Sequence, residues 1–493
     1  MTAIPELTPS RSGWNFDNSY SRLPGAFHTR VNPTPVADPR IVLFNRPLAD
    51  SLGLDSAVLA GPEAAPFFAG NQIPSGAEPI AQAYAGHQFG NLARLGDGRA
   101  ILLGEHRTPS GERFDIQLKG AGPTPYSRRG DGRAGLGPML REYLISEAMH
   151  ALGIPTARSL AVTSTGEPVF REVAFPGAVL TRVAASHIRV GTFEYFAAIG
   201  DTEGLRVLAE YTLRRHFPEC AAAENPVLGL LEAVMERQAS LIAHWMRVGF
   251  VHGVMNTDNM ALSGETIDYG PCAFIDAYDP AAVFSSIDRH GRYAFGQQPN
   301  IAAWNLARLA EALLPILHSE TEAAVNIANE ALESFEGCFQ RHWLDAMRGK
   351  LGLFTAEPDD ASLAAELLRT LHETRSDYTC TFRSLRPNSA AEPPAPAGDA
   401  FTAWRQRWTE RLARQPQPGT EVATLMNAHN PAVIPRNHAV EAALAAATDA
   451  SDLAPLTRLH SALATPYDEA GQRASLLNPP PPGTPPCRTF CGT

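Results

Sequence analysis

Alternating apolar and polar residues predict that the first part of the chain is rich in strands. In residues 113–120, RFDIQLKG, every second residue from Phe114 to Leu118 is apolar, and the residues between them are polar. Because successive side chains of a strand point to opposite faces, this pattern predicts a strand with Lys119 at its end, on the polar face. Residues 92–106, LARLGDGRAILLGEH, predict a strand, a glycine turn and a second strand.

A helix is predicted next. Residues 120–137 are rich in glycine, Pro138 suits the first turn of a helix, and LREYLISEAMHAL continues it to Gly153, which we expect just beyond its end. In a kinase small lobe, a lysine at a strand end pairs with a glutamate of the following helix. Glu142 is the better candidate for this pair and Glu147 the rival, while a solvated helix face is the alternative for either residue.

Helical patterns dominate the rest of the chain. Residues 230–250, LLEAVMERQASLIAHWMRVGF, predict an amphipathic helix that ends near Gly249. Residues 304–317 and 345–354 also have helical patterns, whereas EPPAPAGDA at 392–400 predicts a linker or loop.

Composition narrows the class of protein. The 493 residues include 44% hydrophobic and 19% charged residues, which is typical of a globular enzyme. The formal net charge of -11 opposes non-specific attraction to phosphate backbones, so we expect no nucleic-acid partner. No apolar run approaches the roughly 20 residues that span a bilayer, and the first residues lack the pattern of a signal peptide, so we expect a cytoplasmic protein without a membrane segment.

Residues 252–270, HGVMNTDNMALSGETIDYG, are similar to the catalytic and metal-binding segments of a protein kinase. In the kinase H-R-D-x-x-x-x-N loop, the aspartate accepts a proton and the asparagine five residues later binds magnesium. That spacing places Val254 before Asn259, and valine cannot accept a proton. Asp258, however, directly precedes Asn259. An Asp-Tyr-Gly tripeptide begins at Asp268, where a D-F-G motif would fall. The pattern indicates that the metal ligands are retained and that the base is relocated.

Longer motifs extend the likeness over nearly the whole chain. They are FDNSYSRLPGAFHTRVNPTPV at 16–36, AYAGHQFG at 83–90, LGDGRA at 95–100, QLKGAGPTPYSRRGDGRAGLGPMLREYL at 117–144, HGVMNTDN at 252–259, TIDYGP at 266–271 and the terminal TFCGT. Together they resemble the SelO/YdiU family of protein nucleotidyltransferases, which have a kinase-like fold and transfer AMP instead of phosphate.

This resemblance implies an α+β, bilobal protein-kinase-like fold with a β-rich N-lobe, a helical C-lobe and a C-terminal helical extension. We expect the N-terminal region and N-lobe over residues 1–185, the C-lobe with the catalytic and metal-binding segments over 186–390, and the extension, with its proline-rich tail, over 391–493.

The resemblance also implies a set of nucleotide contacts. They are Gly96, Gly98, Arg99, Lys119, Asp131, Gly132, Arg182, Arg189 and Asp268. In this interpretation the nucleotide is inverted, and Lys119, Arg182 and Arg189 bind the terminal phosphates, because a guanidinium holds phosphate oxygens in a bidentate fork. The alternatives are ordinary turns at the two Gly-containing segments and solvated surface arginines.

The expected reaction is AMP transfer from ATP to Ser, Thr or Tyr hydroxyls of proteins, with release of pyrophosphate. Asn259 and Asp268 would bind Mg²⁺ or Mn²⁺, and Asp258 would be the base. The resemblance links the family to UMP transfer from UTP to Tyr or His as well. Two alternatives stay open: a phosphotransferase that uses Asp258 in a shifted register, and a nucleotide-binding pseudokinase scaffold.

The histidines and cysteines add little chemistry in this interpretation. We expect His252 and His87 to be structural, because neither has an H-x-H or H-E-x-x-H partner. The six cysteines form no paired C-x-x-C sets. In the resembling family the third residue from the end, Cys491 here, is associated with redox control, and its pairing with an upstream cysteine is a hypothesis. We expect Cys487 to be an incidental thiol in an accessible tail.

Overall fold

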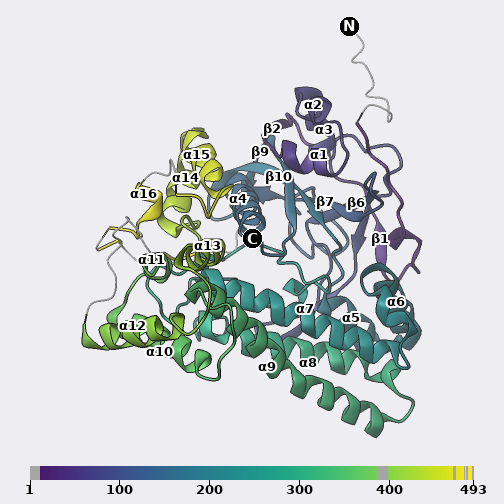
Figure 1. The fold of residues 1–493 in the computed structure, drawn as a ribbon. Helices are drawn as coiled ribbons and strands as arrows, with labels where there is room; N and C mark the ends of the chain where they lie inside the picture. Colours follow the sequence, from purple (N-terminus) through teal and green to yellow (C-terminus); the bar gives the residue numbers. More distant parts are fainter. Residues whose placement is uncertain (1–11, 387–397, 470–473, 482, 485–486, 491–493) are drawn as a thin grey trace.

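The computed structural model describes residues 12–386, 398–469, 474–481, 483–484 and 487–490. Its architecture is mixed α/β, with a β-sheet and helices that lie on and below it (Figure 1). The strands are β1 (His28–Arg30), β2 (Arg40–Phe44), β3 (Ile80–Gln82), β4 (Ala85–Gln88), β5 (Asn91–Arg94), β6 (Ala100–Arg107), β7 (Arg113–Lys119), β8 (Ala134–Gly135), β9 (Arg158–Phe170), β10 (Ala174–Ala184), β11 (Phe250–Val251) and β12 (Ala273–Phe274).

The helices follow the predicted distribution, with most of them after the sheet. They are α1 (Arg46–Ser51), α2 (Ser56–Leu59), α3 (Ala65–Ala69), α4 (Leu136–Ala151), α5 (Val190–Ile199), α6 (Thr202–His216), α7 (Pro226–Val248), α8 (Gln298–Leu317), α9 (Thr321–Leu351), α10 (Asp360–Thr374), α11 (Tyr378–Ser384), α12 (Asp399–Leu412), α13 (Gly419–His429), α14 (Asn437–Asp449), α15 (Ala454–Leu463) and α16 (Ala474–Leu477). Among the described residues, no helix is long and apolar enough to cross a membrane.

The main sheet is antiparallel throughout. Its strand order is β1-β3-β6-β7-β10-β9-β2, and the short β8 pairs with β10. The predicted strand that ends at Lys119 is confirmed as β7. Its apolar residues Ile116 and Leu118 pack with Leu48 of α1 and Phe68 of α3, so these small helices cover one face of the sheet. The opposite face carries the polar side chains of β7.

α4 packs on the sheet through the predicted apolar positions. The helix begins at Leu136, has Pro138 in its first turn and ends before Gly153, whose φ of +74° is in the left-handed region that favours glycine. Leu140 of α4 shares a core cluster with Leu180 of β10. The helix prediction is confirmed, including its C-terminal glycine.

The predicted helix over residues 230–250 is α7. It starts four residues earlier, at Pro226, where Asn225 caps it by accepting a hydrogen bond from the Leu228 amide at 3.1 Å, and it ends at Gly249 in the left-handed conformation. α8 and α9 are longer than the patterns at 304–317 and 345–354 predicted. The first part of the predicted linker at 392–400 falls outside the described residues, and α12 starts at Asp399.

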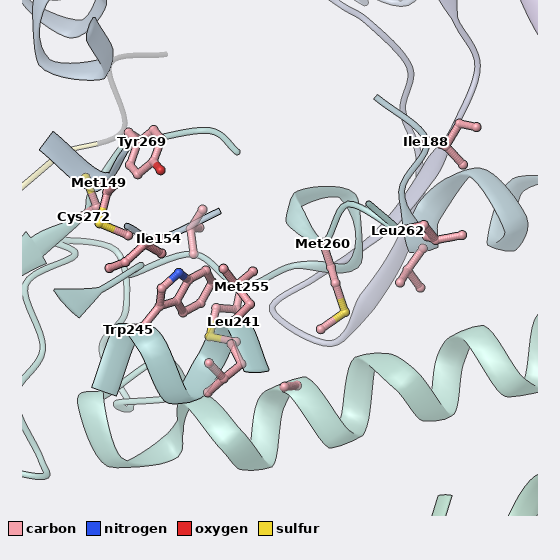
Figure 2. Close-up of a cluster of buried hydrophobic side chains, with 14 of the residues drawn as sticks. Met149, Ile154, Ile188, Leu241, Trp245, Met255, Met260, Leu262, Tyr269 and Cys272 are labelled. Atoms are coloured by element: carbon pink, nitrogen blue, oxygen red, sulfur yellow. The ribbon is translucent and has the colours of Figure 1, made fainter. Parts of the chain in front are cut away.

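A buried apolar cluster anchors the two segments that carry the kinase-like motifs (Figure 2). Figure 2 shows Met255 beside Leu241 and Trp245 of α7. Met255 belongs to residues 252–259, the predicted catalytic loop, which is called the catalytic loop below. It also shows Tyr269, which follows Asp268, near Met149 of α4. Both motifs are thus held against helices α4 and α7 by buried apolar contacts.

The described residues near the C-terminus pack against the segment after the Asp-Tyr-Gly motif. The Thr489 amide donates to Phe284 O at 2.9 Å, and the Ser286 amide donates to Thr489 O at 2.9 Å. Cys487 is half-buried, with its Sγ 4.0 Å from Glu441 Oε1. Cys487 is therefore partly accessible, and it packs against the described body of the protein. Cys491 lies outside the described residues.

Candidate active site

A pocket of about 860 Å³ opens between the sheet, α4 and the catalytic loop. Every residue that the sequence analysis proposed for catalysis, nucleotide binding or metal binding lines it. These are Gly96, Gly98, Arg99, Lys119, Asp131, Gly132, Arg182, Arg189, Asp258, Asn259 and Asp268. The fold thus gathers residues that are up to 172 positions apart in the chain, from Gly96 to Asp268.

Lys119 and Arg182 share one face of the sheet. Arg182 of β10 stands opposite Gln117 of β7, and Gln117 and Lys119 are two residues apart on that strand, so the three side chains point to the same side. Glu142 of α4 accepts hydrogen bonds from Lys119 Nζ at 2.7 Å and from Arg182 Nε at 2.9 Å. Burial by itself would raise the pKa of Glu142, but Arg182 and Lys119 outweigh it and lower the pKa.

The choice between the two glutamates is settled by these contacts. Glu142 pairs with Lys119, as predicted for the better candidate. Glu147 lies elsewhere on α4 and binds Arg158 in a two-pronged contact, with N–O distances of 2.8 and 2.6 Å. Glu147 therefore supports the packing of α4 on the sheet and does not reach the pocket.

Asp268 joins the cationic cluster from the other side of the pocket. Its Oδ1 accepts hydrogen bonds from Lys119 Nζ and, at 2.6 Å, from Arg182 Nη2, and its Oδ2 lies 3.9 Å from Arg189 Nη1. Burial raises the pKa of Asp268, but the three cations together hold it well below its usual value. The residue has a φ of +62°, in the left-handed region, so the local backbone is strained in order to aim this carboxylate. Three cations thus converge on one carboxylate.

Arg189 connects this cluster to the catalytic loop. It precedes the first turn of α5, is almost fully buried, and donates from Nη1 to the backbone oxygen of Asp258 at 2.9 Å. Its guanidinium lies 4.3 Å from the centre of the Tyr84 ring, a cation–π contact. One arginine therefore contacts both the loop and the deep end of the pocket.

Asp258 and Asn259 lie in one turn of 3-10 helix, Thr257–Asn259. Asp258 Oδ1 is buried and has no hydrogen-bond partner among the described residues. Burial raises the pKa of Asp258 to about 6, although Arg189 opposes the shift. The side-chain Nδ2 of Asn259 donates to Val254 O at 2.9 Å, which directs the side-chain Oδ1 away from that bond. Asp258 is therefore a stronger base than an ordinary aspartate.

The β4–β5 hairpin, which contains most of the AYAGHQFG motif, packs against the catalytic loop. The His87 amide donates to Thr257 Oγ1 at 2.7 Å, and the Phe89 amide donates to Asn256 Oδ1 at 3.2 Å. Two hydrogen bonds to the residues just before Asp258 thus fix the hairpin and the loop to each other.

Gly86 brings the same hairpin into contact with Asp258. A Cβ atom at Gly86 would lie 2.2 Å from Asp258 Oδ1, so a side chain there would displace the carboxylate. The imidazole Nδ1 of His87 is hydrogen-bonded to Glu194 of α5, and the ring of His252 is bonded through Nε2 to Ile267 O at 2.9 Å. The structural roles predicted for both histidines are confirmed.

The Gly-Asp-Gly-Arg segment is not the turn of a hairpin. The predicted strands on either side of it exist, but β5 pairs with β4, whereas β6 pairs with β3 and β7. Gly96 has a φ of +116°, and a Cβ atom there would lie 2.4 Å from the Tyr126 ring. The ordinary-turn alternative is therefore wrong here: the segment crosses between two sheets and lines the pocket.

Asp131 and Gly132 lie at the rim of the pocket. The Asp131 side chain is 45% exposed and pairs with Arg171 of the β9–β10 turn. Gly132 has a φ of +66°, and a Cβ atom there would lie 2.0 Å from Gly122 O, so the position requires glycine. Arg99 lines the pocket, and its backbone oxygen accepts a hydrogen bond from the Gly120 amide at 2.7 Å.

Comparison with known proteins shows the family of the chain. The family model described as "Protein adenylyltransferase SelO" matches residues 11–464. The chain belongs to the SelO family. It is 60% identical over 486 residues to the "Protein nucleotidyltransferase YdiU" of Syntrophotalea carbinolica, covering 99% of both chains. It is 58% identical over 482 residues to the protein of that name from Bacillus cytotoxicus, covering 98% of each, and 56% identical over 493 residues to that of Alkaliphilus metalliredigens, covering 100% of each. The protein is thus a nucleotidyltransferase.

Nucleotidyltransferases act on a nucleotide and usually need a divalent metal ion. The oxygen ligands in this SelO-family pocket suit such an ion. Asp268 and Asn259 offer carboxylate and amide oxygens, the ligands that Mg²⁺ prefers, and the unpartnered Asp258 Oδ1 lies in the adjacent turn. The Asp268 carboxylate already forms ion pairs with Lys119 and Arg182, so a cation beside it is electrostatically favourable.

The sequence analysis missed Asp97 as a member of this SelO-family pocket. Its carboxylate is 2% exposed, lines the pocket and accepts a hydrogen bond from the Gln82 amide at 3.0 Å. Burial raises its pKa to about 6, although Arg189 opposes the shift. The sequence already pointed to Asp97, because it lies between Gly96 and Gly98, two glycines that were expected to contact the nucleotide.

Proposed function

We propose that this nucleotidyltransferase transfers AMP from ATP to the hydroxyl groups of Ser, Thr or Tyr residues in other proteins, with UMP transfer from UTP to Tyr or His as a second activity. The observation that carries the proposal is the convergence of Lys119, Arg182 and Arg189 at the deep end of the pocket. Two of these cations are bidentate donors that match phosphate oxygens. We infer that they bind the β- and γ-phosphates.

An anchored β,γ-diphosphate leaves the α-phosphorus as the reacting atom. The acceptor oxygen forms a bond to the α-phosphorus. The bond between the α-phosphorus and the α,β-bridging oxygen breaks, and pyrophosphate leaves with the electron pair. We assign the proton of the hydroxyl to Asp258, whose pKa of about 6 makes it a better proton acceptor than an exposed carboxylate. Gly96, Gly98 and Arg99 would border the nucleotide along the sheet, and Asp131 and Gly132 at the rim.

Asn259 and Asp268 would bind the metal. Bound Mg²⁺, or Mn²⁺, neutralises the charge that ATP brings into the site. Asp268 would then exchange its ion pairs with Lys119 and Arg182 for the metal, while these cations turn to phosphate oxygens. The hydrogen bonds of Asp268 to Lys119 and Arg182 support this exchange, because they place the proposed metal ligand beside the proposed phosphate anchors.

Exposed apolar side chains at the pocket rim support a protein acceptor. Phe170 and Ile287 line the pocket, yet they are 70% and 53% exposed. Large apolar residues that stay exposed at a site entrance are typical of surfaces that bind another protein. A small polar acceptor would not bury them.

We also propose that the chain has a kinase-like bilobal arrangement with the three regions 1–185, 186–390 and 391–493. The sheet with α4 would form the N-lobe and α5–α9 the helical C-lobe, which lie above and below in Figure 1. The first boundary falls between β10 and α5, whereas residues 390 and 391 lie outside the described part of the chain.

The test is incubation of the protein and candidate acceptor proteins with ATP labelled separately at the α- and γ-phosphates, with α-labelled UTP in parallel. Covalent label from the α position supports nucleotide transfer. Label from the γ position alone would show a phosphotransferase that uses Asp258 in a shifted register. Nucleotide binding with no label from either position would show a pseudokinase scaffold.

A further inference from the structure

Three side chains that can bind a transition metal meet between α7 and α9, outside the nucleotide pocket. Glu236 belongs to α7, and Cys338 and His342 belong to α9. One ligand atom from each lies within 4.8 Å of the others. Cys338 Sγ is 2.6 Å from Glu236 Oε2, and His342 Nε2 is 2.7 Å from Glu236 Oε1. None of the three lines the nucleotide pocket.

The helices present these groups on facing sides. Cys338 and His342 are four residues apart, so they are neighbours on one face of α9. Glu236 faces them from α7, which packs along α9 (Figure 1). Two ligands from one helix and a third from its neighbour form a tripod whose backbone positions are fixed by helix packing.

The donor set selects the class of ion. A thiolate, an imidazole and a carboxylate together are typical of Zn²⁺, whereas Mg²⁺ and Ca²⁺ prefer oxygen ligands alone. Zinc–ligand bonds of about 2.0–2.3 Å place the ligand atoms of a tetrahedral site roughly 3.5 Å apart. The distances of 2.6 Å and 2.7 Å from the carboxylate of Glu236 therefore need to widen by about 1 Å, which side-chain rotation can supply.

There is room beside the cluster for an ion and a fourth ligand. A pocket of about 660 Å³ adjoins it, lined by Glu232, Glu236, Gly337 and Cys338 among others. A Cβ atom at Gly337 would meet nothing within 4 Å, so this wall of the pocket is open. Glu232 lies one turn before Glu236 on α7, where its carboxylate or a water molecule can complete the coordination.

Arg341 is the competitor of an ion at this position. Its Nη2 donates to Glu236 Oε1 at 2.9 Å and to Oε2 at 2.7 Å, and it lies 3.4 Å from Cys338 Sγ. The Arg341 side chain is 55% exposed, so its guanidinium can turn into solvent when an ion arrives. On binding, the thiol proton of Cys338 leaves to solvent and the neutral imidazole of His342 donates its lone pair.

We propose that Glu236, Cys338 and His342 bind a Zn²⁺ ion that links α7 to α9. α7 leads directly through β11 into the catalytic loop, so the ion would stabilise the helix that carries the loop. This site is structural, and it is separate from the Mg²⁺ or Mn²⁺ proposed for the nucleotide pocket.

The test is titration of the metal-free full-length protein with Co²⁺, which reports a bound thiolate by a charge-transfer absorption. The nucleotide pocket does not contribute, because no cysteine is among the described residues that line it. We expect one equivalent to bind with this absorption and Zn²⁺ to displace it. Cys338→Ser should abolish the absorption, and His342→Ala should weaken binding at least ~10-fold. Cys220→Ser, at another partly exposed cysteine, is the matched control and should leave both unchanged.

Arg341→Ala provides an independent measurement. If its guanidinium competes with the ion, the variant should bind Co²⁺ and Zn²⁺ more tightly than the wild type, and Zn²⁺ should raise its melting temperature. A titration without thiolate absorption, or with the same absorption in Cys338→Ser, would overturn the proposal. So would an Arg341→Ala variant whose affinity for the ion is lower than that of the wild type.

Discussion

Arg182 donates a hydrogen bond from Nη2 to Asp268 Oδ1 at 2.6 Å. The proposed phosphate anchor and the proposed metal ligand thus neutralise each other directly. Each would acquire a new partner when ATP and a divalent ion bind together, because phosphate attracts the guanidinium and the cation attracts the carboxylate. If both proposals hold, the pair would make nucleotide binding and metal binding mutually dependent.

Asp268→Ala tests the metal assignment. We expect AMP transfer to fall by at least ~10³-fold, because charge stabilisation by the metal contributes several kcal/mol to such reactions. The readout is transfer of label from α-labelled ATP. Asp345→Ala, which removes an exposed carboxylate from α9, is the control and should retain activity. If Asp268→Ala kept its α-transfer, the metal assignment would be wrong.

The acid side of the pH profile should report Asp258. Burial raises its pKa to about 6 in the metal-free protein, and bound Mg²⁺ would move this value downward. A base must be unprotonated, so kcat/KM should fall about tenfold per pH unit below this pKa. Asp97→Asn is a matched control, since burial raises the pKa of Asp97 to about 6 as well. If Asp97→Asn no longer lost kcat/KM at low pH, the group that titrates would be Asp97 and not Asp258.

Glu142 and Glu147 should separate catalysis from stability. Glu142→Gln removes the carboxylate that positions Lys119 and Arg182, and we expect kcat/KM for AMP transfer to fall ~100-fold with weaker ATP binding. Glu147→Gln breaks the contact with Arg158 and should cost about 1–3 kcal/mol in unfolding free energy, with nearly normal activity per folded molecule. Denaturant melts and titrations with ATP distinguish the two, and equal activity losses would refute the assignment.

Gly86→Ala should disable the base without removing the nucleotide site. The added methyl group would lie 2.2 Å from Asp258 Oδ1 and would move the carboxylate. We expect kcat to fall ~100-fold while the Kd for ATP changes less than about threefold. Gly25→Ala is the control, because a Cβ atom there meets nothing within 4 Å. Normal turnover by Gly86→Ala would show that the hairpin does not position Asp258.

Local patterns predicted the elements that carry the site, but not their connections. β7, α4 and α7 follow from apolar spacing and end residues such as Gly153 and Gly249, since these depend on nearby positions. The pairing of β5 with β4 does not follow in the same way. A strand of four residues carries no mark of its partner, so its pairing with β4 depends on tertiary context.

By itself, the sequence determined which residue types line the pocket: a lysine at a strand end, a glutamate on the next helix, and a loop with valine at position 254 and aspartate at 258. Only the tertiary structure decided which partners these side chains have and how deeply they are buried. It turned Asp268 toward three cations and left Asp258 Oδ1 buried without a partner. It also brought Glu236 onto Cys338 and His342 across two helices. Charge and burial depend on neighbours that are distant in the chain, and residue spacing does not encode them.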